Sequence, residues 1–243
     1  MARLSTANDI LNRAAVELGL PKSNNPVGSQ DETFVQLTEL LDACGQEMVE
    51  LHPWQVLVKE FQVTTTDQDT GTYSLPDDFS YMIDQTGWER SQSVPIGGPL
   101  SAQDWTFLVG NDSVSQTIYA SFRLVNNEFE IYPQPPPTDL DINFEYISRN
   151  WAARSGDMTT RFDYVDSGSN IILYEPILII KFLKTKFLSA KGLDASAAAL
   201  DFDTMFQSRI GKDVGASILS ASRSAAFPYI SPYRNTGDTN FGG

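Results

Sequence analysis

The amino-acid sequence predicts an α+β fold: a four-helix bundle of two N-terminal and two C-terminal helices, with an inserted antiparallel β domain and an extended C-terminal tail. Apolar residues recur at helical spacing near both ends of the chain, and at every second position in the middle. Beyond the last helical pattern, Pro228 and Pro232 exclude a helix. We expect the halves of the bundle at 1–53 and 171–221, the β domain at 54–170, and the tail at 222–243.

The first 53 residues contain two amphipathic helical patterns. In the first, Ser5 or Thr6 is expected to cap the start of the helix. The second opens with a capping-box pattern at 29–32, in which Ser29 is the cap, and it ends before Pro53. The residues expected to face the core are Ile10, Leu11, Ala14, Ala15 and Leu18 in the first helix, and Phe34, Leu37, Leu41, Cys44, Met48 and Leu51 in the second.

From Trp54 onward the apolar period changes to two, which indicates strands. Asn126 and Asn127 stand between two alternating segments, and asparagine tolerates the left-handed conformations of a tight hairpin turn. The stretch "LDINFEYIS" at 140–148 also alternates, and "QPPP" at 134–137 indicates a stiff connector. The residues expected on buried strand faces are Phe61, Val63, Phe122, Leu124, Phe129, Ile131, Leu140, Ile142, Phe144 and Tyr146.

Helical signals return at Pro176, a residue type favoured in the first turn. Apolar side chains surround the helix that follows, so we expect it to be mostly buried. Gly192 ends this helix, and Asp194 caps a last one that reaches about Ser222. The residues expected to form the core-facing seam of the last helix are Leu200, Met205, Ile210, Val214 and Ile218.

Four lysines supply the charge of the helix that begins at Pro176. They are Lys181, Lys184, Lys186 and Lys191. Helical spacing scatters them over several directions, so they do not form one basic stripe. Three interpretations remain open: pairing with a neighbouring subunit, solvation, and contact with DNA.

The sequence offers few candidates for chemistry. His52 is the single histidine, and no second histidine or cysteine pair accompanies it to bind zinc. Asp67 and Asp69 lack the further ligands of a calcium loop and indicate a polar hairpin loop. Asp77 and Asp78 indicate a turn in which their side chains bond nearby backbone donors. We therefore expect no enzymatic activity, no cofactor and no metal ion.

The chain is strongly acidic, with a formal net charge of −14 and a pI near 4.3. Such a chain does not attract nucleic acid, because neutralising phosphates requires Lys and Arg. It is compatible with a passage through which DNA slides without adhering. Cys44 is the only cysteine, which excludes an intrachain disulfide. No signal-peptide pattern is present and the longest apolar block, 171–183, is too interrupted to span a bilayer, so we expect a soluble protein.

Several short stretches resemble the head-to-tail adaptor proteins (also called connector or tail tubular proteins) of short-tailed bacteriophages. They are "NDILNRAAVELGL", "HPWQVLVKEF", "TYSLPDDF", "FRLVNNEFEIYPQPP" and "INFEYIS", and they cover most of residues 7–150 in pattern. Each motif is short, and their order is the stronger signal. The resemblance implies a helical bundle, a β domain and an extended C-terminal segment.

The resemblance also implies a function in the virion, after assembly in the host cytoplasm. Adaptors of this family form a twelvefold ring beneath the portal protein and join it to the tail nozzle or next tail component, around the channel through which DNA leaves. DNA would pass through this lumen without specific binding, and no membrane is involved. The residues that match the portal-docking segment by composition and position are Arg223, Phe227, Pro228, Tyr229, Ile230, Tyr233, Arg234 and Phe241.

Two other classes of function are weighed against the adaptor. A receptor- or glycan-binding tail module would use Trp88, Trp105 and Trp151 to stack on sugars, whereas packing in a core or between subunits is the ordinary use of such tryptophans. An acidic-residue hydrolase would need two carboxylates at a defined separation, which the sequence does not supply.

Overall fold

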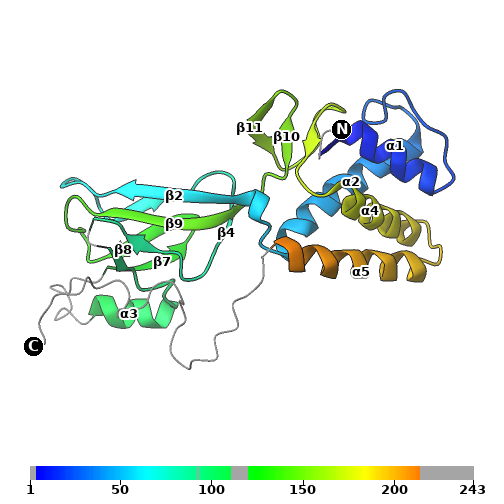
Figure 1. Ribbon diagram of the computed structural model, residues 1–243. Helices are drawn as coiled ribbons and strands as arrows, with labels where there is room; N and C mark the ends of the chain where they lie inside the picture. The colour runs from blue at the N-terminus through cyan, green and yellow to red at the C-terminus, as the bar shows by residue number, and fades with distance from the viewer. Residues whose placement is uncertain (1–3, 92, 111–119, 214–243) are drawn as a thin grey trace, which may run out of the picture.

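The computed structural model describes residues 4–91, 93–110 and 120–213, which form a helical body and a β body side by side (Figure 1). The helices are α1 (Ala7–Glu17), α2 (Glu32–Leu51), the 3-10 helix η1 (Gln55–Leu57), α3 (Ala102–Gly110), α4 (Pro176–Ala190) and α5 (Ser196–Asp213). The strands are β1 (Ser5–Thr6), β2 (Val58–Thr64), β3 (Thr72–Ser74), β4 (Phe79–Met82), β5 (Trp88–Glu89), β6 (Val94–Pro95), β7 (Ser121–Val125), β8 (Glu128–Tyr132), β9 (Asp141–Ser148), β10 (Ala152–Arg154), β11 (Asp157–Phe162) and β12 (Ile171–Ile172).

The helical body confirms that helices from both ends of the chain pack together. α4 contacts α1, α2 and α5, and its apolar side chains are buried on most sides. A small antiparallel sheet with the strand order β1-β12-β10-β11 packs on the same core, and the sequence did not predict it. The division of the chain at residue 170 stays a prediction, although Trp151 to Tyr174 contribute to the helical core.

Local polar signals set the starts of the first two helices. Thr6 caps α1, because its hydroxyl accepts a hydrogen bond from the backbone N–H of Asp9 at 3.2 Å, as predicted. The prediction that Ser29 caps α2 is wrong. Asp31 is the cap, and its carboxylate accepts from the N–H of Thr33 at 2.8 Å. An aspartate next to the helix start competes well for this role, because its charge also favours the positive end of the helix dipole.

The starts of the last two helices follow the prediction. Pro176 stands in the first turn of α4. Asp194 precedes α5, and its carboxylate accepts from the N–H of Ser196 at 2.9 Å. The predicted extension of α5 to Ser222 lies outside the described residues, which end with Asp213.

Two apolar residues predicted to face the core are exposed instead. Leu51 is 48% exposed at the end of α2, and Leu200 is 69% exposed on α5. On α5 the buried residues are Phe202 and Phe206, whose rings stack at 5.5 Å, and Phe202 also stacks on Phe182 of α4 at 4.4 Å. Met205 and Ile210 of the predicted seam pack against the core, whereas Leu200 does not, and Phe202 and Phe206 bury the larger apolar area; Val214 and Ile218 lie outside the described residues.

Trp151 fills the centre of the helical body. It is fully buried, stacks on Tyr174 at 6.2 Å, and its indole N–H donates to the carbonyl of Asp163 at 3.0 Å. Gly45 of α2 makes room for the indole, since a Cβ at this position would lie 2.0 Å from Trp151 Cε2. The close approach of helix and tryptophan is thus fixed by one glycine.

The β body consists of two antiparallel sheets that share an aromatic core. One sheet has the order β2-β9-β5-β6, with β4 also paired to β9, and the other has the order β3-β8-β7. Phe61 and Phe144 from the first sheet meet Phe129 from the second, with ring centroids 5.4–5.9 Å apart. The predicted hairpin is confirmed, because Asn126 and Asn127 join β7 to β8 with positive φ angles of 51° and 59°.

Two features of the β body differ from the prediction. Helix α3 lies within the region expected to hold only strands and loops. The loop with Asp67 and Asp69 is not a hairpin loop, because β2 pairs with β9 and β3 pairs with β8, so the loop crosses from one sheet to the other. The Asp69 carboxylate stabilises the conformation of the loop, because it accepts hydrogen bonds from the Thr66 N–H and the Tyr73 hydroxyl.

Within the described residues, no helix combines the length and the apolar character that crossing a membrane requires.

Candidate functional site at the junction of the two bodies

Within the described residues, the chain crosses between the helical body and the β body twice, and both crossings lie at the same place. The first leads from α2 through η1 into β2, and the second leads from β9 through Arg149 and Asn150 into β10. Because β2 and β9 are paired neighbours, with Val58 opposite Ile147, the two crossings run side by side. The contacts around them determine how one body is held on the other.

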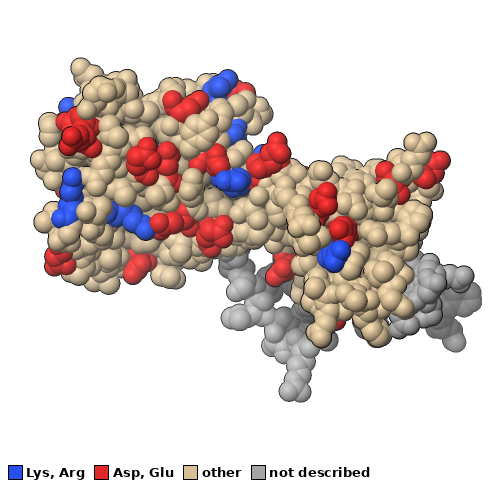
Figure 2. Space-filling model, turned by 180° about the vertical axis from the view of Figure 1, so that it is seen from behind, with Lys and Arg blue, Asp and Glu red and all other residues tan. Residues whose placement is uncertain are grey.

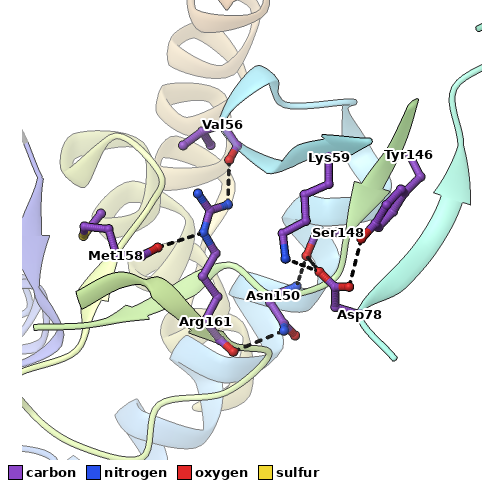
Figure 3. A network of polar contacts seen from close by, with 8 residues as sticks. All are labelled: Val56, Lys59, Asp78, Tyr146, Ser148, Asn150, Met158 and Arg161. Carbon is purple, nitrogen blue, oxygen red and sulfur yellow. Dashed lines mark hydrogen bonds and ion pairs between the residues drawn. The ribbon is translucent and has the colours of Figure 1, made fainter. Parts of the chain in front are cut away.

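A carboxylate at this junction, that of Asp78, receives three hydrogen bonds (Figure 3). Its partners are the Lys59 ammonium at 2.6 Å, the Ser148 hydroxyl at 2.5 Å and the Tyr146 hydroxyl at 3.0 Å. The backbone carbonyl of Asp78 also accepts from the Arg149 N–H at 2.8 Å. We call Asp78, Lys59, Tyr146 and Ser148 the Asp78 network. It ties the start of β4 to β2 and to the end of β9, where the second crossing begins.

The environment of Asp78 favours its ionised form. Burial alone raises the pKa of this carboxyl, but the hydrogen bonds and charge of Lys59, together with the Ser148 and Tyr146 hydroxyls, outweigh burial and lower the pKa below its ordinary value. The pKa of the Tyr146 hydroxyl is raised, first by burial and then by the Asp78 charge. The network is therefore charged and fully formed at neutral pH.

A second contact crosses the junction from the helical body. Arg161 of β11 donates from Nη1 to the carbonyl of Val56 in η1 at 3.0 Å, and from Nε to the carbonyl of Met158 at 3.2 Å (Figure 3). Asn150 on the second crossing donates to the Arg161 carbonyl at 3.1 Å. Both crossings are thus hydrogen-bonded to the same strand.

Strand β4 supplies a third contact, because its side chains reach α2. The Tyr81 hydroxyl donates to the carbonyl of Val49 at 3.3 Å, and the Ser80 hydroxyl lies 3.3 Å from the Glu50 carboxylate. Tyr81 and Ile83 also pack against the core of the helical body. The Arg161 contacts and the β4 contacts join the two bodies beside the crossings, which indicates a stiff junction rather than a free hinge.

A polar hollow of about 500 Å³ opens beside the junction. Its lining residues are Lys59, Asp77, Asp78, Arg149, Asn150, Thr159, Arg161, Phe162 and Asp163. Arg149 pairs with Asp163 at 2.8 Å and Lys59 pairs with Asp78 at 2.6 Å, so four of the six charged side chains of the lining are in ion pairs. With three cations and three carboxylates, the lining has no excess of either sign to select a charged ligand.

The sequence indicated the turn at Asp77 and Asp78 but not the use of Asp78. The turn is present, since the Phe79 N–H bonds to the Pro76 carbonyl at 2.9 Å. The predicted bonding of Asp78 to nearby backbone donors is wrong, because its carboxylate bonds side chains from two distant strands. No local sequence pattern predicts such partners. The sequence shows only that an aspartate stands directly before a strand. If packing of the strand also buries this carboxylate, the carboxylate needs hydrogen-bond partners.

His52 and Asp213 mark the place where the chain leaves the described structure. The Asp213 carboxylate at the end of α5 accepts from the Gln55 N–H at 3.0 Å and lies 3.3 Å from His52 Nε2. The His52 ring is buried with its edge against Trp54 at 4.8 Å. His52 therefore packs against α5 instead of contacting the last carbonyls of its own helix. The segment after Asp213 starts beside the first crossing.

All eight predicted portal-docking residues, from Arg223 to Phe241, lie outside the described residues. The described chain ends at Asp213, whose carboxylate lies beside Gln55 at the junction.

The lysines of α4 pair with carboxylates of their own chain. For three of the four lysines this is a fourth arrangement, beside pairing with a neighbouring subunit, solvation and contact with DNA. The pairs are Lys181–Asp201 at 3.0 Å, Lys184–Glu17 at 3.7 Å and Lys186–Glu47 at 2.6 Å. They connect α4 to α5, α1 and α2. Lys191 lies over the ring of Phe187, with its ammonium 5.4 Å from the centroid.

The tryptophans proposed for sugar stacking are largely inaccessible. Trp151 is fully buried, and Trp105 is 5% exposed between Tyr132 and the Arg123 guanidinium, which lies 4.5 Å from the indole centroid. Trp88 is half-buried in β5. Packing is the role that the structure gives to Trp105 and Trp151, so these residues do not support a glycan-binding module.

Asp42 of α2 ties the helical body to the segment after β11. Its carboxylate accepts from the Val165 N–H at 2.9 Å. Burial raises the pKa of Asp42 to about 6, the bond from Val165 opposes this rise, and the charges of Glu39 and Asp163 add to it. Asp42 is thus ionised at neutral pH at a cost in folding free energy.

We expect Asp42→Asn to stabilise the protein at pH 7.5 by about 1 kcal/mol, a value reduced for the partial exposure of the side chain. A carboxyl whose pKa is raised on folding contributes stability below its unfolded pKa of 3.8, and this contribution is lost as pH rises through about 6. The advantage of the variant should therefore vanish near pH 4. Urea unfolding from pH 4 to 7.5 measures it, with the exposed Asp203→Asn as control. An equal effect of Asp42→Asn at both pH values would contradict the prediction.

Acidic residues are concentrated in the β body. Residues 54–148 contain fourteen Asp and Glu and three Lys and Arg, so most of the net charge of −14 lies there. All three cations are paired within this region: Lys59 with Asp78, Arg90 with Glu60 and Arg123 with Glu130. On the face in Figure 2, cations and carboxylates are interspersed over the helical body, whereas carboxylates predominate over the β body.

The described residues contain no group of three or more His, Cys, Asp or Glu side chains placed to hold a metal ion. The described residues thus form two bodies joined at a junction of paired polar side chains. The sequence model of the SU10 adaptor protein family matches residues 5–234, nearly the whole chain, and the chain belongs to this family of phage adaptor proteins. A search of the curated proteins found no match.

Proposed function

We propose that this chain is the subunit of a head-to-tail adaptor ring that joins the portal protein to the tail nozzle or next tail component. The observation that carries the proposal is the junction. A ring held between two partners needs two contact bodies at a fixed separation, because a free hinge would spread the second contact over many positions. The Arg161 contact and the β4 contact with α2 support that stiffness, and the Asp78 network holds together the strands of the β body that lie beside them.

The C-terminal segment is proposed as the strap that docks on the portal. Its aromatic anchors, Phe227, Tyr229, Tyr233 and Phe241, are separated by Ser, Asn, Thr and Gly, which keep a strap soluble before assembly. Arg223 and Arg234 would pair with portal carboxylates and fix the register. In a twelvefold ring the copies bind together, so modest affinity per strap is multiplied.

The acidic β body suits the surroundings of a DNA channel. Its carboxylates outnumber its cations, and all three cations are paired with carboxylates of the same region. Carboxylates that face the lumen would repel the DNA backbone and prevent adhesion during ejection. Three of the four lysines of α4 are paired with carboxylates of the same chain, which reduces their attraction for the DNA backbone.

Electron microscopy of the full-length chain mixed with the portal encoded by the same genome tests the proposal. We expect a twelvefold ring on the tail-facing side of the portal, absent when the portal is omitted from the grid or replaced by an unrelated dodecameric ring. Lack of any complex with the portal would contradict the adaptor ring. Binding of the chain to a glycan array in that case would favour the receptor-binding module instead.

A further inference from the structure

Strand β2 has an open edge. In an antiparallel sheet, successive residues direct their backbone N–H and C=O groups to opposite sides of the strand. On β9, the carbonyl of Asp141 accepts from the N–H of Arg90, and the carbonyl of Glu145 accepts from the N–H of Ile83. The backbone N–H and C=O groups of Asp141 and Glu145 therefore point away from β2. Their partners on β2 are Thr64 and Glu60. It follows that the N–H and C=O groups of Glu60, Gln62 and Thr64 point outward, away from β9.

No other strand in the described part of the chain covers this edge. β2 pairs with β9 alone, and the side chains of Glu60, Gln62 and Thr64 are exposed. Figure 1 shows β2 along the rim of the β body. With seven residues, β2 is one of the two longest strands in the described residues, and a long open edge invites pairing with another chain unless it is covered.

The last described residue, Asp213, lies close to the N-terminal end of β2. Asp213 bonds the N–H of Gln55, three residues before β2 begins at Val58. The 30 residues from 214 to 243 follow. Residues 214–226 can span up to about 45 Å, whereas β2 extends over about 23 Å, so the segment that starts at Phe227 can reach either end of the strand.

The sequence of that segment suits an edge strand. Pro228 and Pro232 are four residues apart and therefore have the same orientation in a strand. If Phe227, Tyr229, Ser231 and Tyr233 direct their backbone groups to β2, the backbone of both prolines faces solvent. The N–H that proline lacks is then not needed for pairing with β2. Proline is accepted on an edge strand in this orientation, and it prevents further strands from adding.

We propose that, in the free protein, residues 227–233 pair as an added strand with the open edge of β2 in the same molecule. In this strand the backbone N–H groups of Tyr229 and Ser231 donate hydrogen bonds to β2, and their carbonyls accept from it. Their partners are the outward-pointing backbone groups of Glu60, Gln62 and Thr64. The strand protects the edge from other chains and keeps the aromatic residues of the strap from aggregating before assembly. Pairing with β2 and docking on the portal use the same residues, so the strap must leave β2 when the portal binds.

Amide hydrogen exchange, followed by NMR on the free full-length protein, tests the pairing. In the wild-type chain we expect slow exchange at Glu60, Gln62 and Thr64. Ser231→Pro removes a donor that faces β2, so exchange at these three amides should accelerate by at least about tenfold. Ile230→Pro is the matched control, because residue 230 has the orientation of the existing prolines and the exchange should stay near that of the wild type.

The amides of Phe61 and Val63 report on folding, because they face β9 and should stay protected in all three proteins. Fast exchange at Glu60, Gln62 and Thr64 in the wild type would overturn the proposal, as would equal effects of Ser231→Pro and Ile230→Pro. Slow exchange that depends on protein concentration would assign the strand to a second copy and overturn the assignment to the same molecule. The measurement needs no portal, so its failure is distinct from failure of the adaptor function.

Discussion

Replacing Asp78 by alanine is expected to lower the free energy of unfolding by about 2–4 kcal/mol. The change leaves the Lys59 ammonium and the hydroxyls of Tyr146 and Ser148 without the acceptor that binds all three. Breaking one side of a buried ion pair typically costs about 3–5 kcal/mol, and this range is reduced here because the Lys59 side chain is 34% exposed. Urea unfolding at pH 7 measures the loss.

The matched control is Asp77→Ala, which removes an exposed carboxylate from the same turn. It should change stability by less than about 0.5 kcal/mol. Because the pKa of Asp78 is lowered on folding, its contribution is present above the unfolded pKa of about 4 and is lost as pH falls below it. The cost of Asp78→Ala should therefore shrink toward pH 3. Equal effects of the two variants at pH 7 would show that the Asp78 network does not stabilise the fold.

Asp78→Ala removes contacts within the β body, beside the start of the second crossing, and leaves the contacts between the bodies in place. The Arg161–Val56 contact and the Tyr81–Val49 contact remain in that variant, so the expected effect is a loss of stability rather than separation of the bodies.

Features set by neighbouring residues could be predicted from the sequence. The Asn126-Asn127 turn, the Thr6 and Asp194 caps and the position of Pro176 each depend on a few adjacent residues. Helix α3 also has a local signal at its start. The Ser101 hydroxyl accepts from the Asp104 N–H at 3.2 Å, which matches a serine followed three residues later by an acidic residue.

The junction could not be predicted, because its contacts join residues far apart in the chain. Asp78 is bonded to Ser148 within the β body, and Arg161 of β11 is bonded to Val56 of η1 across the junction, and no local pattern encodes either pairing. The lysines of α4 illustrate the same limit. Their spacing showed that they point in several directions, but only the packing of α1, α2 and α5 around α4 shows which carboxylate meets each one.

Removing residues 222–243 is expected to abolish portal binding while leaving the fold intact. The described cores of both bodies are formed by residues before 214, so the far-UV circular dichroism and melting of a 1–221 chain should stay close to those of the full-length protein. Burying Phe227, Tyr229, Tyr233 and Phe241 on the portal would contribute about 1.5–3 kcal/mol each before the cost of ordering the strap. Losing several such anchors should weaken binding at least about a hundredfold.

A full-length variant separates the anchors from the mere presence of the segment. Changing Phe227, Tyr229 and Tyr233 together to serine keeps the length and prolines of the strap, and should weaken portal binding about as much as the truncation does. Changing Ser224, Thr236 and Thr239 to alanine is the control, and should leave binding within about threefold, because these polar residues are proposed as spacers. Pull-down on immobilised portal measures all four proteins. If the 1–221 chain binds the portal as tightly as the full-length chain, the portal contact belongs to the helical or β body and the strap has another purpose.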